Sequence, residues 1–144
     1  MEKKKTLSIF CDGGSRGNPG PSAFAFVIYD EKDSVVYKHK SYIGITTNNV
    51  AEYSGVLEAH KWLSKNAENK NVEKAIFILD SELVTKQLNG IYKIKSPQLV
   101  PLAKEIKKIK NELSRVSISV VHTLRDGNKT ADALVNEALD ENGS

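Results

Sequence analysis

Segments that favour β-strands dominate the first third of the chain. Residues 7–12 begin with alternating apolar and polar positions and read through to Asp12, and residues 23–29 and 35–45 are rich in residues that favour strands. A loop rich in Gly and Pro separates the first two segments, and a polar turn over 30–33 separates the second from the third. Connections this short predict an antiparallel meander of three strands.

Helical spacing of apolar positions appears in the rest of the chain. It runs over 49–66 and again over 99–113, where Pro101 leaves the start of the helix open and the opposite face is rich in lysine. Residues 75–79 form a continuous apolar run, which is typical of a buried parallel strand. The remaining predicted elements are a short helix, a strand and a final helix: 81–88, 116–121 and 130–139. The order βββαβααβα predicts an α/β fold in which helices pack on a mixed five-stranded sheet.

Composition and charge exclude few classes of protein. With 40% hydrophobic and 27% charged residues and no repeat or linker, the 144 residues are expected to form one domain, 1–144, with flexible tails at 1–5 and 141–144. The net charge of +3 permits a polyanionic partner without requiring one. The single Cys11 cannot form an internal disulfide, and no zinc-ligand spacing, signal peptide or membrane-spanning run is present. We therefore expect a cytoplasmic protein with no membrane partner.

Four acidic residues stand beside predicted elements, and each has an ordinary structural explanation. Asp12 precedes two glycines, as in a common turn. Glu52 follows Asn49 at the spacing of a helix-capping pair. Asp80 could cap the helix after it, and Asp132 lies in the first turn of the last helix, where a negative charge suits the helix dipole. Taken one at a time, these residues do not identify a site.

The predicted topology nevertheless brings the four carboxylates toward one edge of the sheet. Asp12 and Asp80 end the two strands expected at its centre, where open α/β sheets bind ligands, and Glu52 and Asp132 could reach the same edge. Two unit charges about 5 Å apart repel by roughly 3 kcal/mol at an effective dielectric near 20. Such a cluster needs cations or strongly raised pKa values. Oxygen ligands favour Mg²⁺ or Mn²⁺ over zinc, and two such ions are suited to phosphodiester hydrolysis.

Four sequence blocks surround these carboxylates: "FCDGGSRGNPGPSAFAFVI", "TTNNVAEYSGVLEAHKWL", "IFILDSELV" and "HTLRDGNKTADALVN". Together they resemble the signature blocks of type 1 ribonuclease H, in that family's order and over about residues 6–139. The resemblance implies an endonuclease that hydrolyses the RNA strand of RNA–DNA hybrids with two Mg²⁺ ions, for which Mn²⁺ can substitute, and leaves 5′-phosphate and 3′-hydroxyl ends. It implies Asp12, Glu52, Asp80 and Asp132 as the catalytic metal ligands, with Asp12 bridging both ions.

The resemblance also implies which residues contact the hybrid. Those that match groups contacting the RNA strand or reading the minor groove are Gly13, Gly14, Ser15, Asn18 and Asn48. Thr47 resembles a member of a pocket for a DNA-strand phosphate, and Ser96 stands where that pocket has an Asn. Contacts of this kind are needed because the 2′-hydroxyl is what distinguishes RNA from DNA.

The chain departs from many members of this family in two places. "GIYKIKSPQLVPL" directly crosses the region of an inserted basic helix, so we expect a compact member without that protrusion. The lysine-rich face over 102–113 could replace the protrusion or could simply be solvated. His122 precedes Asp132 by ten residues, which is the spacing of a mobile catalytic His in some members, but it could equally be a strand-end residue.

Three hypotheses about function follow. The leading one is a monomeric, metal-dependent ribonuclease H. A second is a broader nuclease that also cuts double-stranded RNA, and a third is a catalytically silent module of the same fold that binds nucleic acid. The presence of all four carboxylates favours the enzyme over the silent module.

Overall fold

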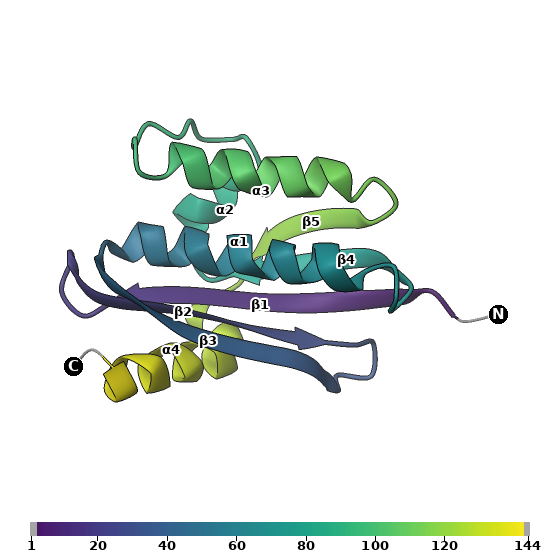
Figure 1. The fold of residues 1–144 in the computed structure, drawn as a ribbon, viewed down its shortest axis with the longest axis horizontal. Helices are drawn as coiled ribbons and strands as arrows, with labels where there is room; N and C mark the ends of the chain where they lie inside the picture. Colours follow the sequence, from purple (N-terminus) through teal and green to yellow (C-terminus); the bar gives the residue numbers. More distant parts are fainter. Residues whose placement is uncertain (1–2, 143–144) are drawn as a thin grey trace.

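The computed structural model describes residues 3–142. Its strands are β1 (Lys5–Ser15), β2 (Gly20–Tyr29), β3 (Val35–Thr46), β4 (Val72–Leu79) and β5 (Ser117–His122) (Figure 1). Its helices are α1 (Asn48–Asn66), α2 (Glu82–Leu88), α3 (Val100–Glu112) and α4 (Lys129–Asn142), with a short 3₁₀ helix η1 (Arg125–Asn128) before α4. The predicted order βββαβααβα is confirmed, and η1 is an addition to it.

Within residues 3–142 the strands form one five-stranded sheet in the order β3-β2-β1-β4-β5. β1 pairs antiparallel with β2 and parallel with β4, and the outer pairs are antiparallel β2–β3 and parallel β4–β5. The predicted mixed sheet is therefore confirmed. β1 occupies its centre with β4 directly beside it.

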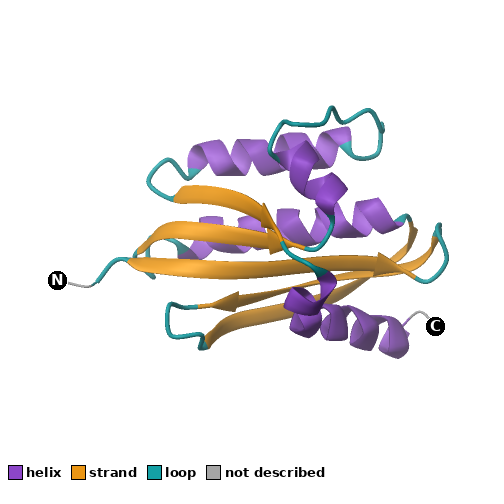
Figure 2. Cartoon of the chain, turned by 180° about the vertical axis from the view of Figure 1, so that it is seen from behind, coloured by secondary structure: helices purple, strands orange, loops and turns teal. Residues whose placement is uncertain are grey.

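Helices cover both faces of this sheet. α1 lies against one face with α3 packed beside it, and α4 lies on the opposite face, as the front and back views show (Figures 1 and 2). Alternation along β2 separates the two cores: Phe24, Phe26 and Ile28 belong to the α1 side, whereas Ala23 and Ala25 belong to the α4 side. α1 and α4 are therefore each held in place by burying one of the two opposite faces of the same strands.

The connection from α2 to α3 is direct. Residues 89–99 contain no helix, so the compact form expected without the basic protrusion is confirmed. α3 buries Ile106 and Ile109 and begins at Val100, which places Pro101 in its first turn, where proline is tolerated. No helix within residues 3–142 is long and apolar enough to cross a membrane.

Several predicted boundaries differ from the structure, and β2 and β4 each begin three residues earlier than expected. β1 does not end at Asp12 but continues to Ser15, because its antiparallel ladder with β2 runs on to the pair Ser15–Ser22. Lys5 lies in β1, and residues 141–142, assigned to a tail, lie in α4. Residues 1–2 and 143–144 of the predicted tails fall outside the described residues.

Candidate active site

The site lies where the parallel ladder between β1 and β4 ends. The last pair of that ladder is Cys11–Leu79, after which β1 continues beside β2 alone. Asp12 is the next residue of β1, and Asp80 is the next residue after β4. Both carboxylates therefore stand at the opening between the two central strands, which is the edge that the sequence predicts.

α1 brings Glu52 to this opening by lying unusually close to β1. A Cβ built on Gly13 would lie 2.3 Å from the carbonyl carbon of Ala51 and 2.4 Å from the nitrogen of Glu52. One turn further on, a Cβ on Gly55 would lie 3.1 Å from the carbonyl oxygen of Asp12. The absence of side chains at these two glycines thus leaves room for the α1 backbone itself.

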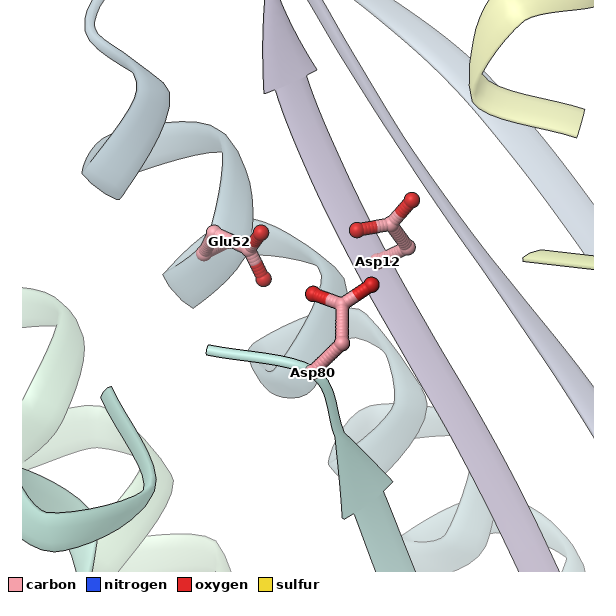
Figure 3. Close-up of side chains that lie close together, drawn as sticks. All are labelled: Asp12, Glu52 and Asp80. Carbon is pink, nitrogen blue, oxygen red and sulfur yellow. The ribbon is translucent and has the colours of Figure 1, made fainter. Parts of the chain in front are cut away.

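Asp12, Glu52 and Asp80 form a compact cluster in which their carboxylates point toward one another (Figure 3). One oxygen from each of the three lies within 4.8 Å of the others. Asp12 is 5% and Glu52 4% exposed, and the buried Oε2 of Glu52 has no hydrogen-bond partner among the described residues. Asp132, exposed in the first turn of α4, lines the same cavity of about 190 Å³.

Burial and mutual repulsion disfavour full ionisation of this cluster. Burial, followed by the charges of Asp80 and Asp132, raises the pKa of Asp12 to about 8. Burial and then the charges of Asp12 and Asp80 raise the pKa of Glu52 well above its usual range. A bound cation would relieve both effects, so the cluster is able to hold a metal ion.

The helix-capping explanations for two of the carboxylates are wrong. Thr47 is the N-cap of α1, and its Oγ1 accepts the N–H of Val50 at 3.3 Å, so Glu52 lies beyond the capping positions. Ser81 caps α2 in the same manner. Asp80 therefore has no capping role either. Only the dipole explanation for Asp132 agrees with the structure.

The predicted substrate residues fall into two groups. Gly13, Gly14, Ser15 and Asn48 line the cavity with the carboxylates, whereas Asn18, Thr47 and Ser96 are not among its lining residues. The Oδ1 of Asn18 accepts the N–H of Asn48 at 3.0 Å, which ties the β1–β2 loop to the start of α1. The Ser96 carbonyl accepts the first N–H groups of the α3 region, so its observed contact is with that helix start.

His122 is the last residue of β5 and does not line the cavity. Its exposed ring donates from Nε2 to the main-chain carbonyl of Asp80 at 3.3 Å. This contact fits a strand-end residue. It also places His122 against the main chain of Asp80, and a catalytic role stays a prediction.

Some residues at the site were not assigned by sequence reasoning. Arg16, Arg125 and Asn136 line the cavity, and Arg16 pairs with Asp140 at 2.7 Å. Asn128 is buried and donates to the carbonyl of Cys11, 117 positions away in the chain. The local spacing of residues in the sequence does not reveal contacts between segments that are so far apart in the chain.

Comparisons with known proteins agree with this geometry. A family model described as reverse transcriptase-like matches residues 10–138. The chain is 35% identical over 133 residues to the "Bifunctional protein Rv2228c" of Mycobacterium tuberculosis, covering 92% of this chain and 35% of that protein. It is also 35% identical over 135 residues to the "Ribonuclease HI" of Halobacterium salinarum, covering 94% of this chain and 65% of that protein. The chain thus spans about a third of the mycobacterial relative and just under two thirds of the haloarchaeal one.

A solved structure, described as LC11-RNase H1 in complex with RNA/DNA hybrid, superposes with a TM-score of 0.86 at 40% identity, covering 94% of this chain and 97% of that one. Likeness at this level extends over the sheet and the helices on both faces, and the family-model match includes Asp12, Glu52, Asp80 and Asp132. The chain belongs to the type 1 ribonuclease H family.

Proposed function

We propose that this protein is an endonuclease that hydrolyses the RNA strand of RNA–DNA hybrids with the help of divalent metal ions. The observation that carries the proposal is the convergence of Asp12, Glu52, Asp80 and Asp132 on one cavity at the edge of the sheet. LC11-RNase H1, a structural neighbour at 40% identity, is described in complex with an RNA/DNA hybrid, which supports the choice of substrate.

The donor set fits hard divalent cations. Three carboxylate oxygens lie within 4.8 Å of one another, and the buried Oε2 of Glu52 has no partner among the described residues. Asp12, Glu52, Asp80 and Asp132 would hold Mg²⁺, with Mn²⁺ as a substitute, because oxygen ligands without sulfur or imidazole suit these ions. Two ions bound there would activate water and stabilise the leaving oxygen, giving 5′-phosphate and 3′-hydroxyl ends.

The neighbouring residues bind and orient the hybrid. We assign the main chain of Gly13, Gly14 and Ser15 and the linked pair Asn18–Asn48 to the RNA strand and the minor groove, since most of them border the carboxylates. Recognition there has to include the 2′-hydroxyl. Thr47, and with it Ser96, is assigned to a DNA-strand phosphate, and His122 to proton transfer or product release beside Asp80. Monomeric state and cytoplasmic location stay predictions from the sequence.

The test is cleavage of end-labelled duplexes of one sequence: RNA–DNA hybrid, double-stranded RNA and double-stranded DNA, each with Mg²⁺, Mn²⁺ or chelator. We expect metal-dependent cutting of the RNA strand of the hybrid and no cutting of DNA, with 5′-phosphate ends on the products. Cleavage of double-stranded RNA at a comparable rate would contradict specificity for the hybrid and support the broader nuclease. No cleavage of any duplex under any condition would identify a silent module.

A further inference from the structure

One buried amide connects the carboxylate cluster to the helix that carries Asp132. Asn128 is the last residue of η1, lies just before α4, and is 1% exposed. Its Nδ2 donates to the carbonyl of Cys11 at 2.9 Å and, over a longer 3.4 Å, to Oδ2 of Asp80. The side chain therefore bridges η1 to the last β1–β4 pair and to a clustered carboxylate.

The two acceptors fix the orientation of this amide. If the amide were flipped, Oδ1 would face the Cys11 carbonyl and the Asp80 carboxylate, and three oxygens would repel one another. In the observed orientation Oδ1 is buried without a hydrogen-bond partner among the described residues. A buried polar atom without a partner lowers stability. Buried polar atoms without a partner are expected mainly at functional sites.

Asparagine is the side chain that suits this geometry. Its NH₂ group offers two hydrogens to two acceptors on neighbouring segments, and it adds no charge beside Asp80. Leucine has a similar volume without a donor, and serine is shorter with a single donor. Asp at this position would add a further carboxylate to a cluster in which like charges already repel.

We propose that Asn128 is a positioning residue that holds the carboxylate of Asp80, and through Cys11 the main chain leading to Asp12, in the arrangement that binds divalent metal. Asn128 acts through these residues and has no contact with the substrate. The inference rests on the proposed function of the same site. Removal of a side chain that orients metal ligands typically weakens metal affinity or activity by about 10- to 100-fold.

The first experiment measures Mn²⁺ binding by calorimetry in the full chain for wild type, Asn128→Leu and the control Asn89→Leu. Nδ2 of Asn89 donates to the Val120 carbonyl at 3.0 Å, so the control also loses an amide–carbonyl bond between two elements, but away from the carboxylates. We expect Mn²⁺ affinity to fall about 10- to 100-fold in Asn128→Leu and to stay at the wild-type level in Asn89→Leu. Wild-type affinity in Asn128→Leu would overturn the inference.

Hybrid cleavage across a Mg²⁺ series supplies a readout that a purely structural defect would not move. We expect the rate of Asn128→Leu to recover in part as Mg²⁺ is raised, with KM for the hybrid near the wild-type value. A rate deficit that stays constant over the series would contradict the positioning role. If circular dichroism shows Asn128→Leu to be unfolded, Asn128→Ser takes its place with the same expectations.

Failure of this inference can be told apart from failure of the proposed function. A wild-type protein that neither binds Mn²⁺ nor cleaves the hybrid refutes the function and, with it, the inference. A wild-type protein that does both, alongside an Asn128→Leu variant with wild-type affinity, refutes the inference alone.

Discussion

Gly13 and Ala51 approach so closely that no side chain fits between them. A Cβ on Gly13 would lie 2.3 Å from the carbonyl carbon of Ala51 and 2.4 Å from its oxygen, and these atoms are backbone that cannot rotate away. The contact places the start of α1 directly on β1. Glu52 consequently enters the cluster with Asp12 and Asp80.

Gly13→Ala is therefore expected to push α1 away from β1. Overpacking of this kind costs about 1–3 kcal/mol in the free energy of unfolding, and the displaced Glu52 should also slow hybrid cleavage. Urea denaturation measures the first effect. Gly14→Ala is the matched control for stability, because a Cβ there would meet only Cγ1 of Val135 at an ordinary 3.5 Å. Equal stability of the two variants would contradict this account of the contact.

The clustered carboxylates predict an unusual pH dependence for the metal-free protein. Because the pKa of Asp12 is raised from 3.8 to about 8, the folded state keeps a proton that the unfolded state releases. The free energy of unfolding should therefore decrease as the pH rises toward 8. Urea denaturation in chelator at pH 6.5 and 8 measures this, and Asp12→Asn should remove the part of the decrease due to Asp12.

Metal binding should oppose this loss of stability. A bound cation displaces the proton from Asp12, so Mg²⁺ affinity is expected to increase with pH up to about 8, with release of protons on binding. Calorimetry in two buffers of different ionisation enthalpy counts those protons. Affinity and proton release that do not change between pH 6 and 8.5, the interval bracketing that pKa, would contradict the raised pKa of the cluster.

His60 predicts a second, opposite dependence at acid pH. Its ring is 1% exposed, stacks on Phe77 at 4.0 Å between centroids, and donates to the Val56 carbonyl at 2.8 Å. Burial lowers the pKa of His60 from 6.5 to about 4. Between these two pH values the unfolded state binds a proton that the folded state does not bind. Stability should fall as the pH drops from 6.5 toward 4.

His60→Phe is the variant that isolates this effect, because it keeps the stacked ring and removes the titratable nitrogen. We expect it to flatten the acid-side loss of stability measured by urea denaturation, with little change in pH dependence above pH 7. An equally steep acid-side loss in wild type and His60→Phe would show that other groups are responsible.

Most of the fold could be predicted from local sequence pattern, because the composition and spacing of apolar residues differ between strands and helices. Residues 23–29 of β2 are rich in residues that favour strands, and the apolar positions of α1 follow helical spacing because that helix packs one side on the sheet, so the type and order of both could be predicted. The end of β1 could not be predicted in this way. Gly13, Gly14 and Ser15 are not strand formers, and they are held in β1 by their ladder with β2.

In the candidate site, too, local sequence placed some residues, whereas others depend on contacts between distant segments. Asp12 and Asp80 could be placed because they follow apolar strands whose ends define the edge of the sheet. The choice of Thr47 over Asn49 as the cap of α1 depends on how the chain leaves β3, which neighbouring polar residues do not reveal. The role of Asn128 could not be predicted, because its hydrogen-bond acceptors lie in β1 and at the end of β4, far away in the sequence.

The most direct test of the central claim is the rate of hybrid cleavage by Asp12→Asn. This change keeps the side-chain volume and removes one ionisable carboxyl group from the cluster, whereas Asp30→Asn removes a charge in the β2–β3 turn, away from the cavity lining. Metal ions bound at this cluster would supply several kcal/mol of transition-state stabilisation, so cleavage by Asp12→Asn should fall about a hundredfold or more. The melting temperature of Asp12→Asn should be no lower than that of wild type, and Asp30→Asn should be fully active. Wild-type cleavage by folded Asp12→Asn would contradict the assignment of this cluster as the active site.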